Sequence, residues 1–274
     1  MPGLLDRIER YYDALPRSWG ARAEEIGPLT LFVNQSAPWP LYARPSVGAT
    51  AISSEDVAAA RRRMRELRLS ETFEWLLEVT PALRPAALAA GLAVADHPLL
   101  VLTSPAEATV ARVAAVPAEV RAVGPDEDLA AVLSAAHVGF TQPDTGVGLA
   151  GLAELRAATL ERPASEVDSE RRELAAGTAV RYAAWADGEP VCTGRFSAVD
   201  GVAEIVGIGT VPAYRRRGIG AAVTAALTAA ALAAGIEVVF MSAGDADVAR
   251  IYGRLGFTDI GTACIAEPPA ASPH

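Results

Sequence analysis

The segment that most constrains this chain is a strand–turn–helix signature at residues 210–221, TVPAYRRRGIGA. Two glycines, Gly218 and Gly220, stand where the helix is predicted to begin. Glycine lets backbone N–H groups approach an anion closely, and the helix dipole adds about half a positive charge at that end. We therefore expect the N–H groups of Arg217–Ala221 to form a phosphate-binding turn that the preceding arginines strengthen.

Composition limits the classes of protein to which the chain can belong. It has 274 residues, of which 51% are hydrophobic and 21% charged, enough for one large or two modest packed domains. The net charge of −9 argues against nucleic acid as a partner, because nucleic-acid-binding proteins usually present a basic face. The alanine-rich, lysine-free composition suggests a high-GC bacterial genome.

Several kinds of active site are excluded by the residue types present. All 24 basic residues are arginines, so no lysine can form a Schiff base or serve in a nucleotide P-loop. Cys192 and Cys264 are too few for a disulfide framework or a zinc site, and the histidines at 97, 137 and 274 are scattered. We expect no metal, and we expect His137 to be structural.

Localisation is predicted from two negative signals. The N-terminus lacks a basic segment followed by an apolar one, so an export signal is not expected and the cytoplasm is the default. Gly218–Ile236 is uncharged and about long enough to span a membrane, but it consists mostly of Ala, Gly and Thr. A helix buried between layers is the better interpretation, and no membrane partner is expected.

The N-terminal half is predicted to follow a β-α-β-α-β pattern after an initial helix. Ser53 resembles a helix N-cap, and Gly91 a helix C-terminal stop. The expected elements are a helix over the first ~25 residues, a strand at 29–33, a helix at 53–69, a strand at 72–79, a helix at 85–90 and one or two strands within 92–103. Residues 104–119 form the candidate linker.

The C-terminal half is predicted to begin with helices and continue as a meander of strands. Asp187-Gly188 and Asp200-Gly201 are typical hairpin turns. The expected elements are helices at 126–136 and 149–176, strands at 179–185, 191–197 and 202–211, a helix at 218–235, a strand at 238–241, a helix at 246–255 and terminal strands to 266. We expect two domains, at 1–117 and 118–267, and a flexible tail at 268–274.

The glycine turn could belong to either of two cofactor-binding patterns. A dinucleotide fold needs a third glycine and an acidic residue at the end of the next strand. Val223 stands at the third glycine position, and the strand at 238–241 has no acid. The order Arg215-x-x-Gly218-x-Gly220, then Tyr252 and Gly256-Phe257, resembles instead the GNAT superfamily of acyl-CoA-dependent N-acetyltransferases. The resemblance covers about Val120–Glu267.

This resemblance implies a fold and a cofactor. The fold is α/β (α+β), with a mixed, mostly antiparallel sheet flanked by helices, and the smaller β-α-β-α-β N-terminal half is a degenerate partial copy. Acetyl-CoA is the implied acyl donor, with its diphosphate at the glycine turn and its pantetheine arm between two splayed strands. The implied cofactor-binding residues are Ile208, Gly209, Thr210, Arg215, Arg216, Arg217, Gly218, Ile219, Gly220, Ala221 and Asp245. Asp245 stands where the family often has asparagine, and Thr210 where it more often has valine.

The family resemblance also assigns roles in catalysis. Tyr252 aligns with the general acid that protonates the leaving thiolate. Glu204 is the best candidate for the base, acting through water. Direct attack by a primary amine of a small molecule or peptide is expected, without an acyl intermediate on Cys192. Separately, Gly207 and Gly209 inside a predicted strand indicate a bulge or a close approach of backbones.

The acceptor and the role of the N-terminal half stay open. Loops within about 140–178 are expected to select the acceptor, with Thr141–Gly148 flexible and tryptophans contributing from Trp39, Trp75 or Trp185. The main alternative function is a non-catalytic acyl-CoA-binding regulatory module. A third hypothesis is an interaction scaffold whose N-terminal half covers the acceptor cleft or forms a homodimer interface.

Overall fold

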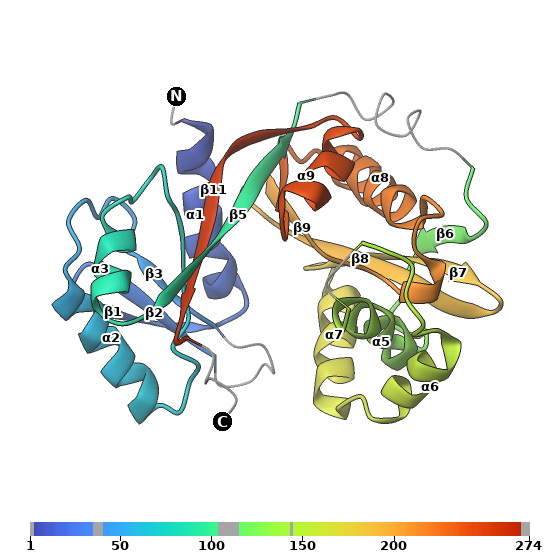
Figure 1. Cartoon of the computed structure of the whole chain (residues 1–274), viewed down its shortest axis with the longest axis horizontal. Helices are drawn as coiled ribbons and strands as arrows, with labels where there is room; N and C mark the ends of the chain where they lie inside the picture. The colour runs from blue at the N-terminus through green and yellow to red at the C-terminus, as the bar shows by residue number, and fades with distance from the viewer. Residues whose placement is uncertain (1–2, 35–40, 104–114, 143–144, 270–274) are drawn as a thin grey trace. The chain divides into compact units, whose positions relative to one another are not determined.

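A computed structural model describes residues 3–34, 41–103, 115–142 and 145–269. Contacts divide the chain into two compact units (Figure 1). The first contains the chain up to Leu99, the segment Ser242–Asp245 and the chain from Ile260 onward. The second contains Leu100–Met241 and Ala246–Asp259. The strand that ends the C-terminal half therefore contributes its residues from Ile260 onward to the first unit, whereas the domain limits 1–117, 118–267 and 268–274 remain predictions.

The first unit is a sheet with helices on both faces. Its strands lie in the order β1-β2-β3-β4-β11-β5. One face packs against α2 and α3 in a core that includes Leu31, Met64, Phe73 and Trp75. The elements are α1 (Leu4–Ser18), β1 (Arg22–Ile26), β2 (Leu29–Val33), β3 (Ala43–Pro45), α2 (Ser54–Glu66), β4 (Phe73–Leu76), α3 (Leu83–Ala89), β5 (Ala93–Leu102) and β11 (Phe257–Glu267).

Helix α1 is fastened to the other face by a buried ion pair. Nη2 of Arg44, on β3, donates to Oε2 of Glu9 at 2.9 Å, and both side chains are almost fully buried. The Arg44 guanidinium also lies 4.6 Å from the ring centroid of Tyr12. Burying this charge is tolerable because a carboxylate and an aromatic face replace its water.

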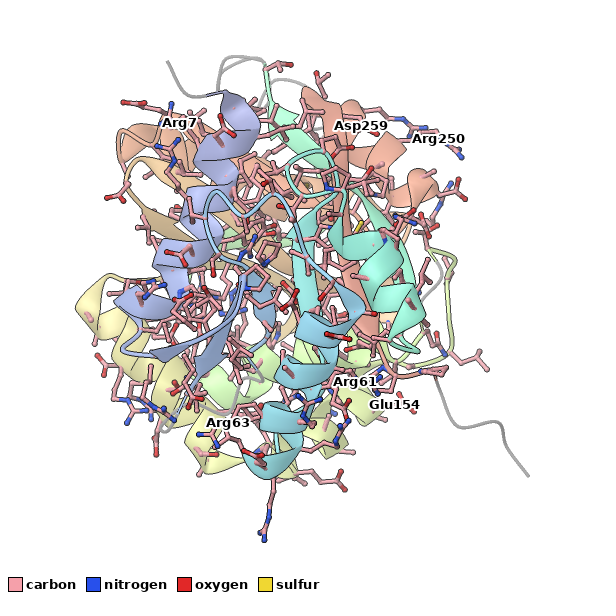
Figure 2. All side chains as sticks on the ribbon, turned by 90° about the vertical axis from the view of Figure 1, so that its left-hand side faces the viewer. Arg7, Arg61, Arg63, Glu154, Arg250 and Asp259 are labelled. Carbon is pink, nitrogen blue, oxygen red and sulfur yellow. The ribbon has the colours of Figure 1, made fainter. Side chains whose placement is uncertain are left out.

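Most predicted elements of this unit are confirmed, and their ends have local causes. The hydroxyl of Ser53 accepts from the Asp56 N–H while Asp56 caps Ser53 in return, so α2 begins with a capping box. The expected helix over the first ~25 residues is wrong beyond Ser18. Gly20, with a φ of +78°, ends α1, and Arg22–Ile26 then forms β1, paired antiparallel with β2. On α2, Arg61 pairs with Glu71 and Arg63 with Glu24; both arginines are labelled in Figure 2.

The second unit has the strand order β10-β9-β8-β7-β6. Helix α8 packs on one face of this sheet, where Leu227 lies against Gly194. Helices α5 and α7 pack on the other face, through Ala136 and Glu170. Both Asp-Gly turns have positive φ at each residue, as predicted for tight hairpins. The elements are β6 (Glu119–Ala122), α5 (Leu129–Phe140), α6 (Leu152–Leu160), α7 (Ala164–Ala176), β7 (Val180–Ala186), β8 (Glu189–Val199), β9 (Val202–Thr210), the short 3₁₀ helix η1 (Pro212–Tyr214), α8 (Ile219–Ala233), β10 (Val238–Ser242) and α9 (Ala246–Gly253).

In this unit, one predicted helix is divided into two and another is confirmed. The single stretch expected at 149–176 is two helices, because Pro163 caps α7 and cannot continue α6. The helix expected from Gly218 to Gly235 is α8, which begins at Ile219. Within the part of the chain that the structure describes, no helix combines the length and apolar character needed to cross a membrane.

A buried charge network holds α7 against the sheet. Glu170 accepts from Arg181 Nε at 2.6 Å and from Arg195 Nη1 at 2.7 Å, and Glu173 accepts from Arg195 Nη2 at 2.5 Å. Arg181 and Arg195 lie on neighbouring strands, opposite each other in the β7–β8 register. The two positive charges keep the pKa of Glu170 below its ordinary value despite its burial.

Candidate functional site

The glycine turn lies between the end of β9 and the start of α8. After η1, Arg216 has a φ of +62° and Gly218 a φ of +77°. A left-handed conformation is easy for glycine but strained for arginine, so the surrounding structure must hold Arg216 in place. These two residues turn the chain sharply enough for α8 to begin at Ile219.

The N-terminus of α8 has the features of an anion site. Its N-cap, Gly218, has no side chain that could accept from the first amides. The first intrahelical bond runs from the Ala222 N–H to the Gly218 carbonyl, at 3.0 Å. The N–H groups of Ile219, Gly220 and Ala221 belong to the first turn, where intrahelical acceptors do not exist. The first turn, which is fully described, carries no acidic side chain, so its dipole is left for an anion.

Gly220 brings this helix end close to the end of β9. A Cβ at Gly220 would lie 3.3 Å from Oγ1 of Thr210 and 3.8 Å from Cγ2 of Ile208. A larger side chain would therefore fill the space between the first turn of α8 and the strand.

Strand β9 contains the bulge that its glycines indicated. Its register with β8 shifts, because Arg195 is opposite Val206 while Thr193 is opposite Gly209. Gly207 takes a φ of +67° there. The extra residue changes the alternation of side chains, so Ile208 and Thr210 face α8 while Gly209 faces α5. A Cβ at Gly209 would lie 2.6 Å from Cα of Ala136, so the prediction of a close backbone approach is also confirmed.

One edge of β9 is left without a neighbouring strand. The described residues of β10 pair with β9 only at Val202, Ala203 and Glu204. Beyond Glu204 the two strands are no longer in register, although β9 continues to Thr210 and stays paired with β8 on its other side. An extended ligand could hydrogen-bond to that edge as an additional strand does.

Tyr252, the candidate acid, lies on α9, close enough to Cys192 for an electrostatic interaction with its side chain. Burial raises the pKa of the Tyr252 phenol above its ordinary value, and the Cys192 thiol raises it further. Cys192 is opposite Thr210 in the β8–β9 register, and Thr210 Oγ1 donates to its sulfur at 3.1 Å. Burial raises the pKa of Cys192 to about 12, so this thiol is neutral and a poor nucleophile.

Glu204, the candidate base, lies at the other end of the open edge. It is buried, and it is opposite Ser197 of β8 and Phe240 of β10. Six residues of extended chain, about 20 Å, separate it from Thr210. Glu204 thus lies where the open edge of β9 begins, and the anion turn comes after Thr210, where β9 ends.

The three arginines of the turn differ in their contacts. The guanidinium of Arg215 binds backbone carbonyls, among them those of Gly139 and Gln142. Its contact with a cofactor stays a prediction. Arg217 donates to the Ala213 carbonyl and lies over the Tyr214 ring. Arg216 is exposed. Sequence reasoning did not predict these carbonyl contacts of Arg215, because they join segments that lie far apart in the chain.

The remaining predicted residues are placed as follows. Asp245 is exposed and belongs to the first unit, so its contact with a cofactor stays a prediction. Trp75 is buried in the core of the first unit, which removes it from the candidate acceptor residues. Trp185 is half-buried beneath the Arg121 guanidinium. Trp39 lies outside the described residues. His137 is exposed on α5.

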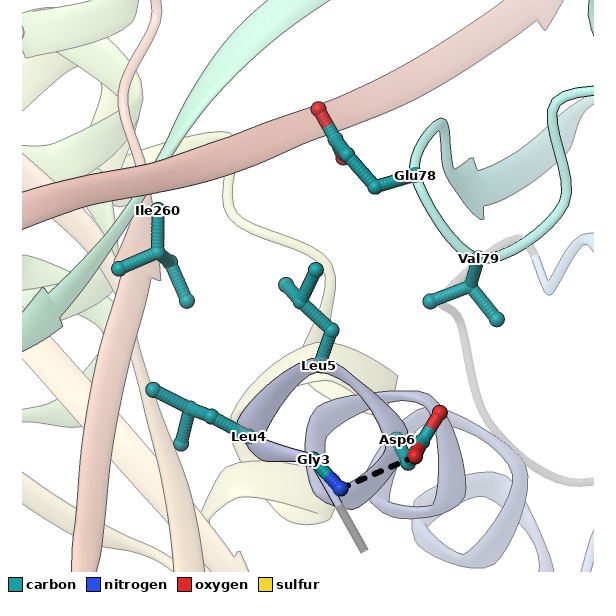
Figure 3. A pocket seen from close by; sticks show the side chains of 7 residues that line it. All are labelled: Gly3, Leu4, Leu5, Asp6, Glu78, Val79 and Ile260. Carbon is teal, nitrogen blue, oxygen red and sulfur yellow. Dashed lines mark hydrogen bonds between the residues drawn. The ribbon is translucent and has the colours of Figure 1, made fainter.

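A separate hollow lies in the first unit beside the start of α1 (Figure 3). Its apolar lining comes from Leu4, Leu5, Val79 and Ile260. Both of its carboxylates already accept backbone hydrogens, since Asp6 binds the Gly3 N–H and Glu78 the Thr262 N–H. Across the described ranges, no group of three or more His, Cys, Asp or Glu side chains is placed to hold a metal ion.

Comparison with known proteins shows a similarity to acetyltransferases. Residues 150–257 match the model of the acetyltransferase (GNAT) family. A GCN5-related N-acetyltransferase from Kribbella flavida is similar over 99% of this chain and 98% of its own, with a TM-score of 0.70 and 23% identity. A putative GNAT acetyltransferase from Novosphingobium aromaticivorans is similar over 96% of each chain, with a TM-score of 0.56 and 18% identity.

A two-part relative is also similar in structure. A tandem GNAT protein from the clavulanic acid biosynthesis pathway matches over 89% of this chain and 79% of its own, with a TM-score of 0.53 and 16% identity. At these identities the structural likeness concerns the fold. No curated protein sequence matches the chain.

Proposed function

Because residues 150–257 form a GNAT acetyltransferase domain within a two-part fold, we propose that the protein is an N-acetyltransferase that uses acetyl-CoA. The family supports acyl transfer in general. The choice of donor, the amine acceptor and the residue roles are our proposals. The single observation that carries them is the turn of N–H groups at Ile219–Ala221 beside the open edge of β9.

The diphosphate of coenzyme A fits the start of α8. It carries negative charge, and the first-turn amides together with the helix dipole form a preorganised anion site. Gly218 and Gly220 add no side chains of their own to this site, and the side chains of Val116 and Thr210 lie beside them, each 3.3 Å from where the glycine Cβ would be. Exposed Arg216 and Arg217 add positive charge at its rim.

The pantetheine arm fits the edge of β9 beyond Glu204. Its amides can pair with the backbone of Ile208–Thr210, where β10 does not. Gly207 and the bulge set the direction of that edge. The arm would then run from the anion turn along the edge of β9 toward Glu204.

The chemistry is a direct transfer within a ternary complex. The neutral amine attacks the thioester carbonyl carbon, a C–N bond forms, and the C–S bond breaks. The departing thiolate takes a proton from the Tyr252 hydroxyl, since a phenol is protonated at neutral pH. The amine proton leaves through water to Glu204. The neutral, buried Cys192 takes no covalent part.

The N-terminal unit is proposed to be a degenerate partial GNAT-like copy in domain 1–117. It has the alternation of strands and helices expected of a copy. We propose that it covers the acceptor cleft or forms a homodimer interface. We also propose that the protein acts in the cytoplasm on a small-molecule or peptide amine.

An acetyl-transfer assay tests this function. The full chain is incubated with acetyl-CoA and a panel of primary amines and peptides, and the release of the coenzyme A thiol is followed. We expect turnover with at least one amine and its loss, with retained coenzyme A binding, in Tyr252→Phe. Binding of coenzyme A without turnover over the whole panel would favour the regulatory module.

A further inference from the structure

Arg215 connects the anion turn to the loop that follows α5. Its Nη2 donates to the Gly139 carbonyl at 2.5 Å and to the Gln142 carbonyl at 2.6 Å. Its Nη1 donates to the Gly146 carbonyl at 3.3 Å and its Nε to the Thr210 carbonyl at 3.3 Å. One guanidinium therefore holds the end of α5, two points of the loop and the end of β9.

Backbone bonds join the same two segments. The Gly148 N–H donates to the Pro212 carbonyl at 3.2 Å, and the Ala213 N–H donates to the Ala150 carbonyl at 2.9 Å. The packing there is tight, since a Cβ at Gly148 would lie 2.7 Å from Cβ of Pro212. The loop therefore lies alongside η1, and η1 leads directly into the anion turn.

The chemistry of this contact requires arginine. The last carbonyls of a helix lack intrahelical donors and carry the negative end of its dipole. A guanidinium is always charged and presents five N–H groups in a rigid plane, so it can satisfy several carbonyls at once. A lysine ammonium at this position would reach fewer of the carbonyls in this arrangement.

We infer that Arg215 is a positioning residue that couples the occupied anion turn to the conformation of residues 145–150. The inference rests on the proposed function, because the anion is taken to be the diphosphate of coenzyme A. An anion that tightens the turn at Gly218–Ala221 also fixes Arg215 and the Pro212 carbonyl, which hold the loop. The loop lies in the region expected to select the acceptor.

Hydrogen–deuterium exchange of the full chain, with coenzyme A as the probe, tests the coupling. Without ligand, Arg215→Gln should speed exchange in the peptide covering 145–151 by about tenfold or more, because local opening becomes easier. Arg156→Gln is the matched control, since Arg156 is exposed and pairs with Glu189 at the surface. It should leave that peptide unchanged. Arg215→Lys should give an intermediate rate, and it replaces the glutamine variant if that one does not fold.

Exchange measured in the presence of coenzyme A distinguishes coupling from a merely structural role of Arg215. In the wild type, coenzyme A should slow exchange at 145–151. In Arg215→Gln, the loop should no longer respond to coenzyme A at a concentration that saturates the variant. Unchanged unliganded exchange, a retained loop response, or complete loss of coenzyme A binding in Arg215→Gln would each overturn the inference. If the wild type itself does not bind coenzyme A, the proposed function fails, while the unliganded exchange still decides whether Arg215 holds the loop.

Discussion

Gly209 of β9 and Ala136 of α5 approach so closely that a Cβ on Gly209 would lie 2.6 Å from the Ala136 Cα and 2.9 Å from its carbonyl oxygen. Both obstructing atoms belong to the backbone, so no rotation of a side chain can relieve the contact. The glycine allows α5 to lie against the bulged part of β9, and it thereby sets the position of the open edge.

Gly209→Ala should therefore destabilise the protein by about 1–3 kcal/mol, the usual cost of overpacking. Urea unfolding followed by circular dichroism measures the loss. Gly253→Ala is the control, because a Cβ at Gly253, at the end of α9, meets no atom within 4 Å. Equal stabilities of the two variants would contradict the close approach.

Removal of Glu170 should leave two buried guanidinium groups, Arg181 and Arg195, without their shared carboxylate. Breaking a buried ion pair by removing one partner typically costs about 3–5 kcal/mol, so Glu170→Ala should unfold at much lower urea concentration. Asp168→Ala, on the same helix, removes an exposed pair with Arg171 and should cost less than about 1 kcal/mol. A small effect of Glu170→Ala would show that the network does not hold α7.

Glu74 should make the stability of the protein depend on pH. Burial raises the pKa of this carboxyl to about 7; Arg44 opposes the shift and Glu267 adds to it. Because the folded state binds the proton more tightly than the unfolded state, this contribution to stability is full below the unfolded pKa, about 4.5, and is lost as the pH rises through about 7. Glu74→Gln should thus gain about 1–3 kcal/mol over the wild type at pH 8.

The measurement is the difference in unfolding free energy between wild type and Glu74→Gln at intervals from pH 5 to pH 8.5. The gain should grow with pH and level off above about pH 7. A flat curve for Glu74→Gln would refute the raised pKa.

Both thiols should be unreactive in the folded protein. Burial raises the pKa of Cys192 to about 12 and that of Cys264 to about 11. At pH 8 about one in a thousand Cys264 thiols is then ionised, and fewer Cys192 thiols. Ellman's reagent should modify the native protein very slowly and both cysteines rapidly in denaturant. Rapid native labelling, assigned with Cys264→Ser, would contradict the buried, neutral state of the thiol concerned.

Local patterns predicted most of the fold correctly. The Asp-Gly turns, the Ser53 cap and the Gly218 helix start are decided by residues adjacent in the chain. The resemblance to the GNAT family indicated the fold, and the glycines of β9 correctly indicated the bulge. These features could be predicted because each depends on a few consecutive residues.

Contacts between distant segments could not be read from the sequence. The side chain of Arg215 reaches Gly139 and Gln142, more than seventy residues away in the chain. Glu170 serves two arginines on different strands, and the residues of β11 from Ile260 onward join the first unit. Such pairings depend on strand order and helix position, which a local pattern does not contain.

The most direct test of the central claim is a calorimetric titration of the protein with coenzyme A. The anion turn predicts saturable one-to-one binding in the wild type and its loss in Gly220→Glu, because the new side chain enters the space beside Thr210 and brings negative charge to the site. Ala233→Glu, which adds the same charge at the exposed far end of α8, should bind as the wild type does. Unaltered binding of coenzyme A by Gly220→Glu would contradict the account.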